Sequence, residues 1–221
     1  MRVCEPLEGE EESCRRPHAT TSMEAAINVL PMAGQDRAIA IPAAGGYFVA
    51  LADGAGGTGN GAVAAECLIA FFTKLSKEAA SADWFAALCA FDDELSARPM
   101  GGQTTGVVAF IDSERVRGAS VGDSSAWLIT PSGRMTDLTA AQRRRPLLGT
   151  GEALPVEFEV DRLGNHVLLG SDGLFKYAPV DRICALATQG TVAEAANALA
   201  NCVRLPSGAL QDDVAVVIVS E

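Results

Sequence analysis

The sequence predicts an α+β domain in which helices cover β-sheets, and three observations support this prediction. Apolar and polar residues alternate over short runs near residue 40 and again between residues 103 and 138, as they do in β-strands. Two long proline-free stretches between these runs carry apolar residues at helical spacing. Strands and helices do not alternate regularly along the chain, which excludes a doubly wound parallel sheet.

The first predicted strands span residues 36–42 and 46–52, and the stretch PAAGG between them predicts a hairpin. A long helix is predicted over residues 60–78 from the spacing of its apolar residues. A second helix follows, with Ser81 or Asp83 as its N-cap, because short polar side chains accept hydrogen bonds from the free N–H groups of a first turn.

The second half of the chain begins with a predicted antiparallel meander over residues 103–138. A polar, arginine-bearing stretch over 139–154 has no clear period. The runs VEFEV and HVLLGSDG predict two further strands, and residues 179–188 and 191–203 predict two helices. The run DVAVVIVSE closes the chain as a buried strand.

The chain is expected to form one domain, residues 23–221, behind a flexible tail, residues 1–22. The tail is acidic, then basic, then rich in Ser and Thr, and it lacks the apolar core of a secretory signal. Hydrophobic residues make up 48% of the chain, and no apolar run approaches the ~18 residues that cross a membrane. We therefore expect a soluble protein that does not enter a membrane.

The formal charge of −11 argues against nucleic acid as a general partner, because a phosphate backbone attracts basic surfaces. The excess of carboxylates fits either solubility or sites for divalent cations, and composition does not separate the two. None of the six cysteines forms a C-x-x-C pair, so reduced core thiols in a cytoplasmic protein are favoured over disulfides or zinc.

Aspartates stand repeatedly beside strand-like runs and glycines, at Asp36, Asp53, Asp123, Asp172, Asp212 and Asp213. A single aspartate there is unremarkable, since Asp is common in turns. Several carboxylates directed from strand ends towards one place repel each other unless they are protonated or bridged by cations. Oxygen ligands alone favour Mg²⁺ or Mn²⁺ over zinc.

The stretch YFVALADGAGGTGNG has an apolar strand ending at Asp53, followed by five glycines in residues 54–61. Glycines allow backbone to approach a partner closely, and that partner is a metal ion, a phosphate or only a tight turn. The two histidines, His18 and His166, exclude a histidine-based triad, and His166 is expected to be a packed strand residue. Hydrolysis at such a site would depend on water activated by metal.

Five motifs resemble, in order, those of the metal-dependent serine/threonine protein phosphatases of type 2C, the PPM family. GQDRAI resembles the opening N-x-D element, and LADGAGG resembles the ADG-x-GG stretch. QTTGVVAFID with ASVGDSSAWLI is similar to the threonine pair and GDSR turn. LLGSDGLFKY resembles the SDG strand end, and LQDDVAVVIVS resembles the closing strand. The resemblance extends from about residue 30 to residue 221, and the chain's size is similar to that of compact bacterial members.

The resemblance implies an α-β-β-α sandwich of two antiparallel sheets flanked by helix pairs, and a site for two Mg²⁺ or Mn²⁺ ions. By motif position, Asp53 would bridge the two ions and Gly54 would add its carbonyl oxygen. Asp172 and Asp212 would each bind at one end of the pair. The resemblance also implies in-line attack on phosphorus by a bridging water that the two ions activate, without a phospho-enzyme.

The resemblance also implies roles for two further carboxylates. Asp36 would help to hold metal-bound water, so that the catalytic carboxylates are Asp36, Asp53, Asp172 and Asp212. Asp123 would bind a third, weaker ion, as in bacterial members. Asp213 stands where the family has Asn or Asp.

The cationic groups of the family are replaced in this chain. Pro31 stands in place of the phosphate-binding arginine five residues before Asp36, and Ser125 replaces the arginine of the GDSR turn. Arg37, or the run Arg143, Arg144 and Arg145, is the candidate contact to substrate phosphate. The run alternatively forms a solvated charge cluster in the region where the family carries a mobile flap.

The predicted function is hydrolysis of phosphoserine and phosphothreonine in proteins. The alternatives are a pseudophosphatase that binds a phosphoprotein or a kinase without turnover, and an acidic rim with structural metal only. The expected partners are a phosphorylated protein substrate and a cognate serine/threonine kinase. We expect a cytoplasmic monomer.

Overall fold

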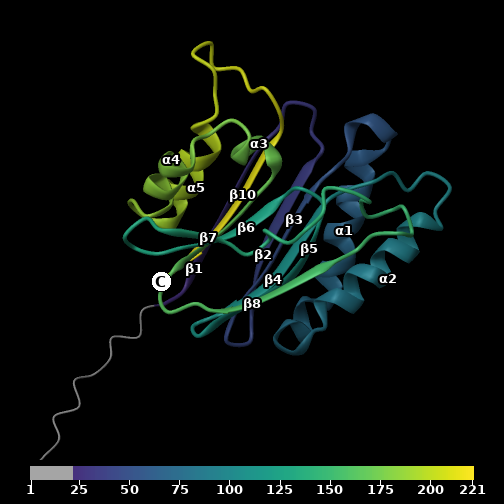
Figure 1. Ribbon diagram of the computed structural model, residues 1–221, viewed down its shortest axis with the longest axis horizontal. Helices are drawn as coiled ribbons and strands as arrows, with labels where there is room; N and C mark the ends of the chain where they lie inside the picture. Colours follow the sequence, from purple (N-terminus) through teal and green to yellow (C-terminus); the bar gives the residue numbers. More distant parts are fainter. Residues whose placement is uncertain (1–21) are drawn as a thin grey trace, which may run out of the picture.

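The computed structural model describes residues 22–221 and shows two β-sheets packed face to face, with helices on both outer faces (Figure 1). Sheet A has the strand order β1-β10-β9-β6-β7, and sheet B has the order β2-β3-β4-β5-β8. Neighbouring strands pair in antiparallel fashion throughout both sheets. The predicted α-β-β-α sandwich is therefore confirmed. The predicted tail, residues 1–22, lies outside the described residues apart from Ser22.

Each strand belongs to one of the two sheets. Sheet A consists of β1 (Glu24–Leu30), β6 (Ser125–Ile129), β7 (Met135–Asp137), β9 (His166–Gly170) and β10 (Val214–Ser220). Sheet B consists of β2 (Asp36–Ala43), β3 (Gly46–Asp53), β4 (Gly106–Asp112), β5 (Arg115–Val121) and β8 (Val156–Asp161). The helices are α1 (Gly61–Leu75), α2 (Trp84–Ser96), α3 (Asp172–Phe175), α4 (Val180–Ala187) and α5 (Val192–Asn201). Two short 3-10 helices are η1 (Gly56–Thr58) and η2 (Ser76–Ser81).

Three apolar layers hold the sandwich together. Along β3, Phe48 and Ala50 pack in the layer formed with α1 and α2, while Val49 and Leu51 pack in the layer between the two sheets. This is the alternation that a pleated strand imposes on successive side chains. A third layer lies between sheet A and the helices α4 and α5. Since both faces of each sheet are covered, the central strands read as continuous apolar runs.

The predicted helices are found with small shifts at their ends. The helix predicted over residues 60–78 is α1 followed by η2. The side chain of Asp83 accepts a hydrogen bond from the backbone N–H of Ala86, so Asp83 rather than Ser81 is the N-cap of α2. Thr191 and Glu194 form a capping box at the start of α5.

Two parts of the fold differ from the sequence prediction. Strand β1 was not predicted, because EAAINVL does not alternate between apolar and polar residues; as the edge strand of sheet A it is only partly covered. The continuous meander over residues 103–138 is also wrong, because β5 belongs to sheet B and β6 to sheet A. Gly122, at φ 101°, lies between them, in a conformation that favours glycine.

The four cysteines in the described part of the chain are free. Cys184 and Cys202 are buried, as predicted for core thiols, whereas Cys67 and Cys89 are partly exposed. Within residues 22–221, none of the helices combines the length and the apolar character needed to span a membrane.

Candidate active site

A cavity of about 810 Å³ is lined by four carboxylates that come from both sheets. Asp53 ends β3 of sheet B, and Asp123 lies in the turn that joins β5 of sheet B to β6 of sheet A. Asp172 follows β9 and Asp212 precedes β10, so both are held by sheet A. The predicted convergence of strand-end aspartates is thus observed at one end of the sandwich.

The end of β3 is fixed by the threonine pair Thr104 and Thr105. The Asp53 N–H donates to Oγ1 of Thr105 at 3.0 Å, and Oγ1 of Thr104 donates to the Asp53 carbonyl oxygen at 3.0 Å. Both threonines are buried, and Oγ1 of Thr105 lies 2.7 Å from Oγ of Ser124. Because Ser124 follows Asp123, this contact joins the backbones that carry two of the four carboxylates.

Glycines permit two close backbone approaches beside the carboxylates. A Cβ at Gly54 would lie 2.3 Å from the carbonyl oxygen of Gly61, and a Cβ at Gly173 would lie 1.9 Å from that of Asp213. Gly54 and the adjacent Gly56 and Gly57 also line the cavity. The glycine-rich stretch after Asp53 therefore makes a tight turn and leaves the cavity wall free of side chains.

Burial raises the pKa values of the central carboxylates. Asp36 lies opposite Asp53 in the β2–β3 register and is 2% exposed. Neither of its carboxylate oxygens makes a well-aligned hydrogen bond within residues 22–221, although the side chains of Ser171 and Asp53 lie close enough to lower its pKa. Burial, reinforced by the charges of Asp213 and Asp172, raises the pKa of Asp36 to about 7. Burial and the four neighbouring carboxylates raise the pKa of Asp53 to about 9.

Neighbouring charges of both signs act on the pKa of Asp172. Burial raises its pKa, and the charges of Asp123 and Asp212 raise it further. The cations Lys176 and Arg144 act in the opposite direction. The cluster is therefore a set of mutually repelling carboxylates that protons or cations stabilise.

The donor set of this cavity fits hard divalent ions. Carboxylate and carbonyl oxygens are the ligands that Mg²⁺ and Mn²⁺ prefer. The buried oxygens of Asp36 make no well-aligned hydrogen bond within residues 22–221. Burial, and then four neighbouring carboxylates, raise the pKa of Asp53, and a bound cation would relieve the repulsion among these carboxylates. No group of three acidic, histidine or cysteine side chains in residues 22–221 is already arranged around a common point for a metal ion.

Of the predicted substrate contacts, Arg144 and Arg145 line the cavity. The Nε and Nη2 atoms of Arg144 donate to Oδ2 of Asp123 at 3.0 and 2.5 Å. Arg143 is exposed and does not line the cavity. Arg37 does not line it either, since its guanidinium donates to Oε1 of Glu66 at 2.6 Å and to the Gly34 carbonyl at 2.8 Å.

Two residues near the site were not assigned these contacts from the sequence. Lys176 places Nζ 3.6 Å from Oδ2 of Asp212. The residues HVLLGSDG were predicted as one strand, whereas Asp172 begins α3 and this short helix brings Lys176 close to the site. Asp213 is buried and accepts the backbone N–H groups of residues 32–35, which outweigh the cost of burial and hold its pKa below the ordinary value.

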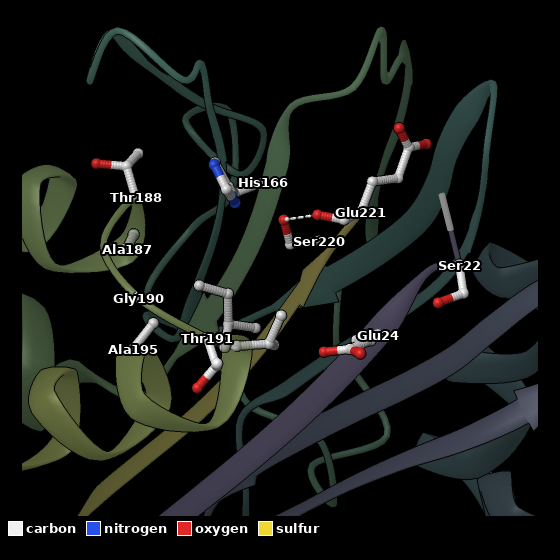
Figure 2. A pocket seen from close by; sticks show the side chains of 12 residues that line it. Ser22, Glu24, His166, Ala187, Thr188, Gly190, Thr191, Ala195, Ser220 and Glu221 are labelled. Carbon is white, nitrogen blue, oxygen red and sulfur yellow. Dashed lines mark hydrogen bonds between the residues drawn. The ribbon is translucent and has the colours of Figure 1, made fainter. Parts of the chain in front are cut away.

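A second cavity, of about 270 Å³, lies by Ser220, at the end of β10 far from Asp212 (Figure 2). Its lining includes His166, Glu24 and Glu221. The Nδ1 atom of His166 is buried without a partner among the described residues, and burial, with the charge of Arg162, lowers its pKa. A neutral, half-buried His166 fits the packing role in a strand that the sequence predicts for it. Of the two cavities, the one lined by carboxylates is therefore the candidate active site.

Two antiparallel sheets packed face to face between helices, with a carboxylate-lined cavity at one end, are the features by which this chain is compared with known proteins. The family model of stage II sporulation protein E (SpoIIE) matches residues 43–220, and the chain belongs to this family. No curated protein sequence matches the chain.

Three solved structures show the same fold. A bacterial serine phosphatase has 20% identity and a TM-score of 0.77, covering 90% of this chain and 98% of its own. The serine/threonine phosphatase Stp1 from Staphylococcus aureus has 20% identity and a TM-score of 0.77, covering 97% and 99%. The catalytic domain of the phosphatase PstP in complex with two manganese ions has 24% identity and a TM-score of 0.72, covering 90% and 97%. The resemblance to type 2C phosphatases is confirmed at the level of family and fold.

Proposed function

We propose that the chain is a metal-dependent phosphatase that hydrolyses phosphoserine and phosphothreonine in proteins. The observation that carries the proposal is the convergence of Asp53, Asp123, Asp172 and Asp212 in one cavity. The fold brings these carboxylates together although burial and neighbouring charges oppose the ionisation of Asp53 and Asp172. The similarity in fold to serine/threonine phosphatases, one of them bound to two manganese ions, supports the same function.

Two Mg²⁺ or Mn²⁺ ions would be held by Asp53, Asp172, Asp212 and the Gly54 carbonyl, with Asp123 for a third. Such ions lower the pKa of bound water and polarise phosphoryl oxygens. Thr104 and Thr105 fix the position of Asp53, and the bare wall at Gly56 and Gly57 leaves room for a phosphorylated side chain. Asp36, with a pKa of about 7, can hold or release a proton at its carboxylate near neutral pH.

Arg144 is the proposed contact to the substrate phosphate, because its guanidinium lies on the cavity wall. A guanidinium donates two parallel hydrogen bonds to a phosphoryl group as readily as to a carboxylate. The pair of hydrogen bonds to Asp123 holds this group in place before substrate binds. Arg37 is the weaker candidate, since it does not line the cavity and its guanidinium is turned to Glu66 and the Gly34 carbonyl.

The second candidate function is a pseudophosphatase that binds a phosphoprotein or a kinase without hydrolysis. Pro31 and the engagement of Arg37 by Glu66 favour it, because both reduce the positive charge available to phosphate. Under either proposal the partner is a phosphorylated protein, with a cognate kinase. The free cysteines fit a monomer that acts in the cytoplasm.

The test is hydrolysis of para-nitrophenyl phosphate and a phosphothreonine peptide, with Mn²⁺ or with EDTA. Turnover that requires Mn²⁺ and is lost in Asp53→Asn and Asp212→Asn supports the phosphatase. The control is Asp181→Asn, an exposed aspartate of α4, which should keep full activity. Full activity in Asp53→Asn with intact circular dichroism refutes the proposal. Metal binding by calorimetry without turnover in the unaltered chain favours the pseudophosphatase.

A further inference from the structure

The arginine run beside the cavity is held at fixed points on both sides. On its N-terminal side, Nε2 of Gln142 donates to the Ser124 carbonyl at 2.7 Å. On its C-terminal side, Leu148 is fully buried and exchanges two backbone hydrogen bonds of 3.1 Å with Thr104. Arg144 in the middle is bound to Asp123. The segment therefore has a defined position at the cavity although it contains no helix or strand.

The two outer arginines differ from the middle one. Arg143 and Arg145 are exposed, and within residues 22–221 their guanidinium groups form neither an ion pair nor a hydrogen bond. Arg145 lines the cavity, whereas Arg143 lies one residue beyond Arg144. The chain thus presents one unpaired cation, Arg145, on the cavity wall and a second, Arg143, two residues away on the exposed surface.

These cations stand out against the charge of the whole chain. With a formal charge of −11, the protein as a whole repels an acidic peptide. A basic patch at the cavity would oppose that repulsion at the place where a substrate enters. Guanidinium groups bind carboxylates in a two-point geometry that lysine does not provide, which makes arginine suited to reading acidic side chains.

We propose that Arg143 and Arg145 select phosphorylated segments that carry aspartate or glutamate close to the phosphorylated residue. The proposal rests on the proposed function and adds the substrate class. Two residues of extended chain span at most about 7 Å, both in the enzyme and in the bound peptide. The Cα atoms of Arg143 and Arg145 therefore lie at most about 7 Å apart, and we assign the two side chains to acidic residues within about two positions of the phosphorylated one.

The experiment compares two phosphothreonine peptides that differ only in having glutamate or alanine at the two positions on either side. We expect kcat/KM to favour the acidic peptide about fivefold, since each exposed ion pair contributes little. In the double variant Arg143→Ala with Arg145→Ala, the ratio should fall to about one through KM. Hydrolysis of para-nitrophenyl phosphate by the same variant is measured beside it, because this substrate has no flanking residues and reports only on contacts to the phosphate itself. The matched control is Arg182→Ala, an exposed arginine of α4, which should keep the ratio.

Several outcomes would overturn the proposal. Equal kcat/KM for both peptides in the unaltered chain refutes the selection while leaving the phosphatase intact. An unchanged ratio in the double variant refutes the assignment to these arginines. A loss of para-nitrophenyl phosphate hydrolysis in the double variant means that the arginines bind the phosphate itself, which also refutes it.

A binding measurement separates this inference from the proposed function. Labelled forms of both peptides are titrated into the unaltered chain and the double variant, and fluorescence anisotropy gives Kd. If no peptide is hydrolysed but the acidic one binds about fivefold more tightly through Arg143 and Arg145, the phosphatase proposal fails and the selection stands. If the two peptides bind equally, the selection fails as well.

Discussion

Replacing Asp53 by asparagine should stabilise the ion-free protein at pH 8, even though it should abolish turnover. Asp53 ends β3 in a partly buried position among other carboxylates. Its pKa of about 9 lies above the ordinary 3.8, so the folded state holds a proton that the unfolded state releases between these values. Stability is therefore full below pH 3.8 and falls as pH rises towards 9. Asparagine removes this loss because it does not ionise.

The magnitude follows from the number of pH units that the shift spans. One pH unit corresponds to about 1.4 kcal/mol for a whole proton. Between pH 5 and pH 8, the unaltered chain should therefore lose up to about 4 kcal/mol of unfolding free energy through Asp53, and Asp53→Asn should not.

The assay is urea unfolding in EDTA at pH 5 and pH 8, followed by circular dichroism. The quantity of interest is the difference in unfolding free energy between Asp53→Asn and the unaltered chain, which cancels the titration of groups that do not interact with Asp53. This difference should be larger at pH 8, whereas Asp181→Asn should show no change with pH. Equal differences at the two pH values would show that Asp53 is not held protonated. Mn²⁺ added at pH 8 should stabilise the unaltered chain more than Asp53→Asn.

Three further variants test the surroundings of the site. Asp213→Ala removes the acceptor of four backbone N–H groups of residues 32–35 and should lower the unfolding free energy by about 3 kcal/mol, measured in urea; a loss under 1 kcal/mol would contradict this. Asp92→Ala should cost about 2 kcal/mol and speed hydrogen exchange at residues 149, 150, 151 and 153, because the Asp92 carboxylate accepts hydrogen bonds from their N–H groups; unchanged exchange would count against it. Gly173→Ala should displace the chain at Asp213 and weaken Mn²⁺ binding by at least about tenfold in calorimetry, because its Cβ would lie 1.9 Å from the Asp213 carbonyl oxygen; native affinity would refute the close approach.

The candidate carboxylates were found from the sequence because their positions depend on local signals. Asp53, Asp123, Asp172 and Asp212 each stand directly beside a strand, and the structure brings all four to one cavity. Their roles in binding metal and in catalysis stay predictions. The helices could also be predicted from the sequence, because apolar spacing and capping residues such as Asp83 are local signals.

Features that depend on the tertiary fold could not be predicted from the sequence. The apolar patterns of β5 and β6 are alike, so the pattern does not reveal that the chain passes from one sheet to the other at Gly122. The direction of Arg37 is decided by Glu66, which lies on α1. The division of the arginine run, with Arg144 bound to Asp123 and its neighbours unpaired, likewise depends on a contact between distant segments.

The origin of the carboxylates in two different sheets has a consequence for the lifetime of the folded chain. A divalent ion held by Asp53 of sheet B and by Asp172 or Asp212 of sheet A would be a crosslink across the sandwich, and the sheets could not separate without releasing it. Unlike a disulfide, this crosslink forms and breaks with the free ion concentration. Resistance to proteolysis and the half-life against unfolding would then rise and fall with the metal content of the surroundings.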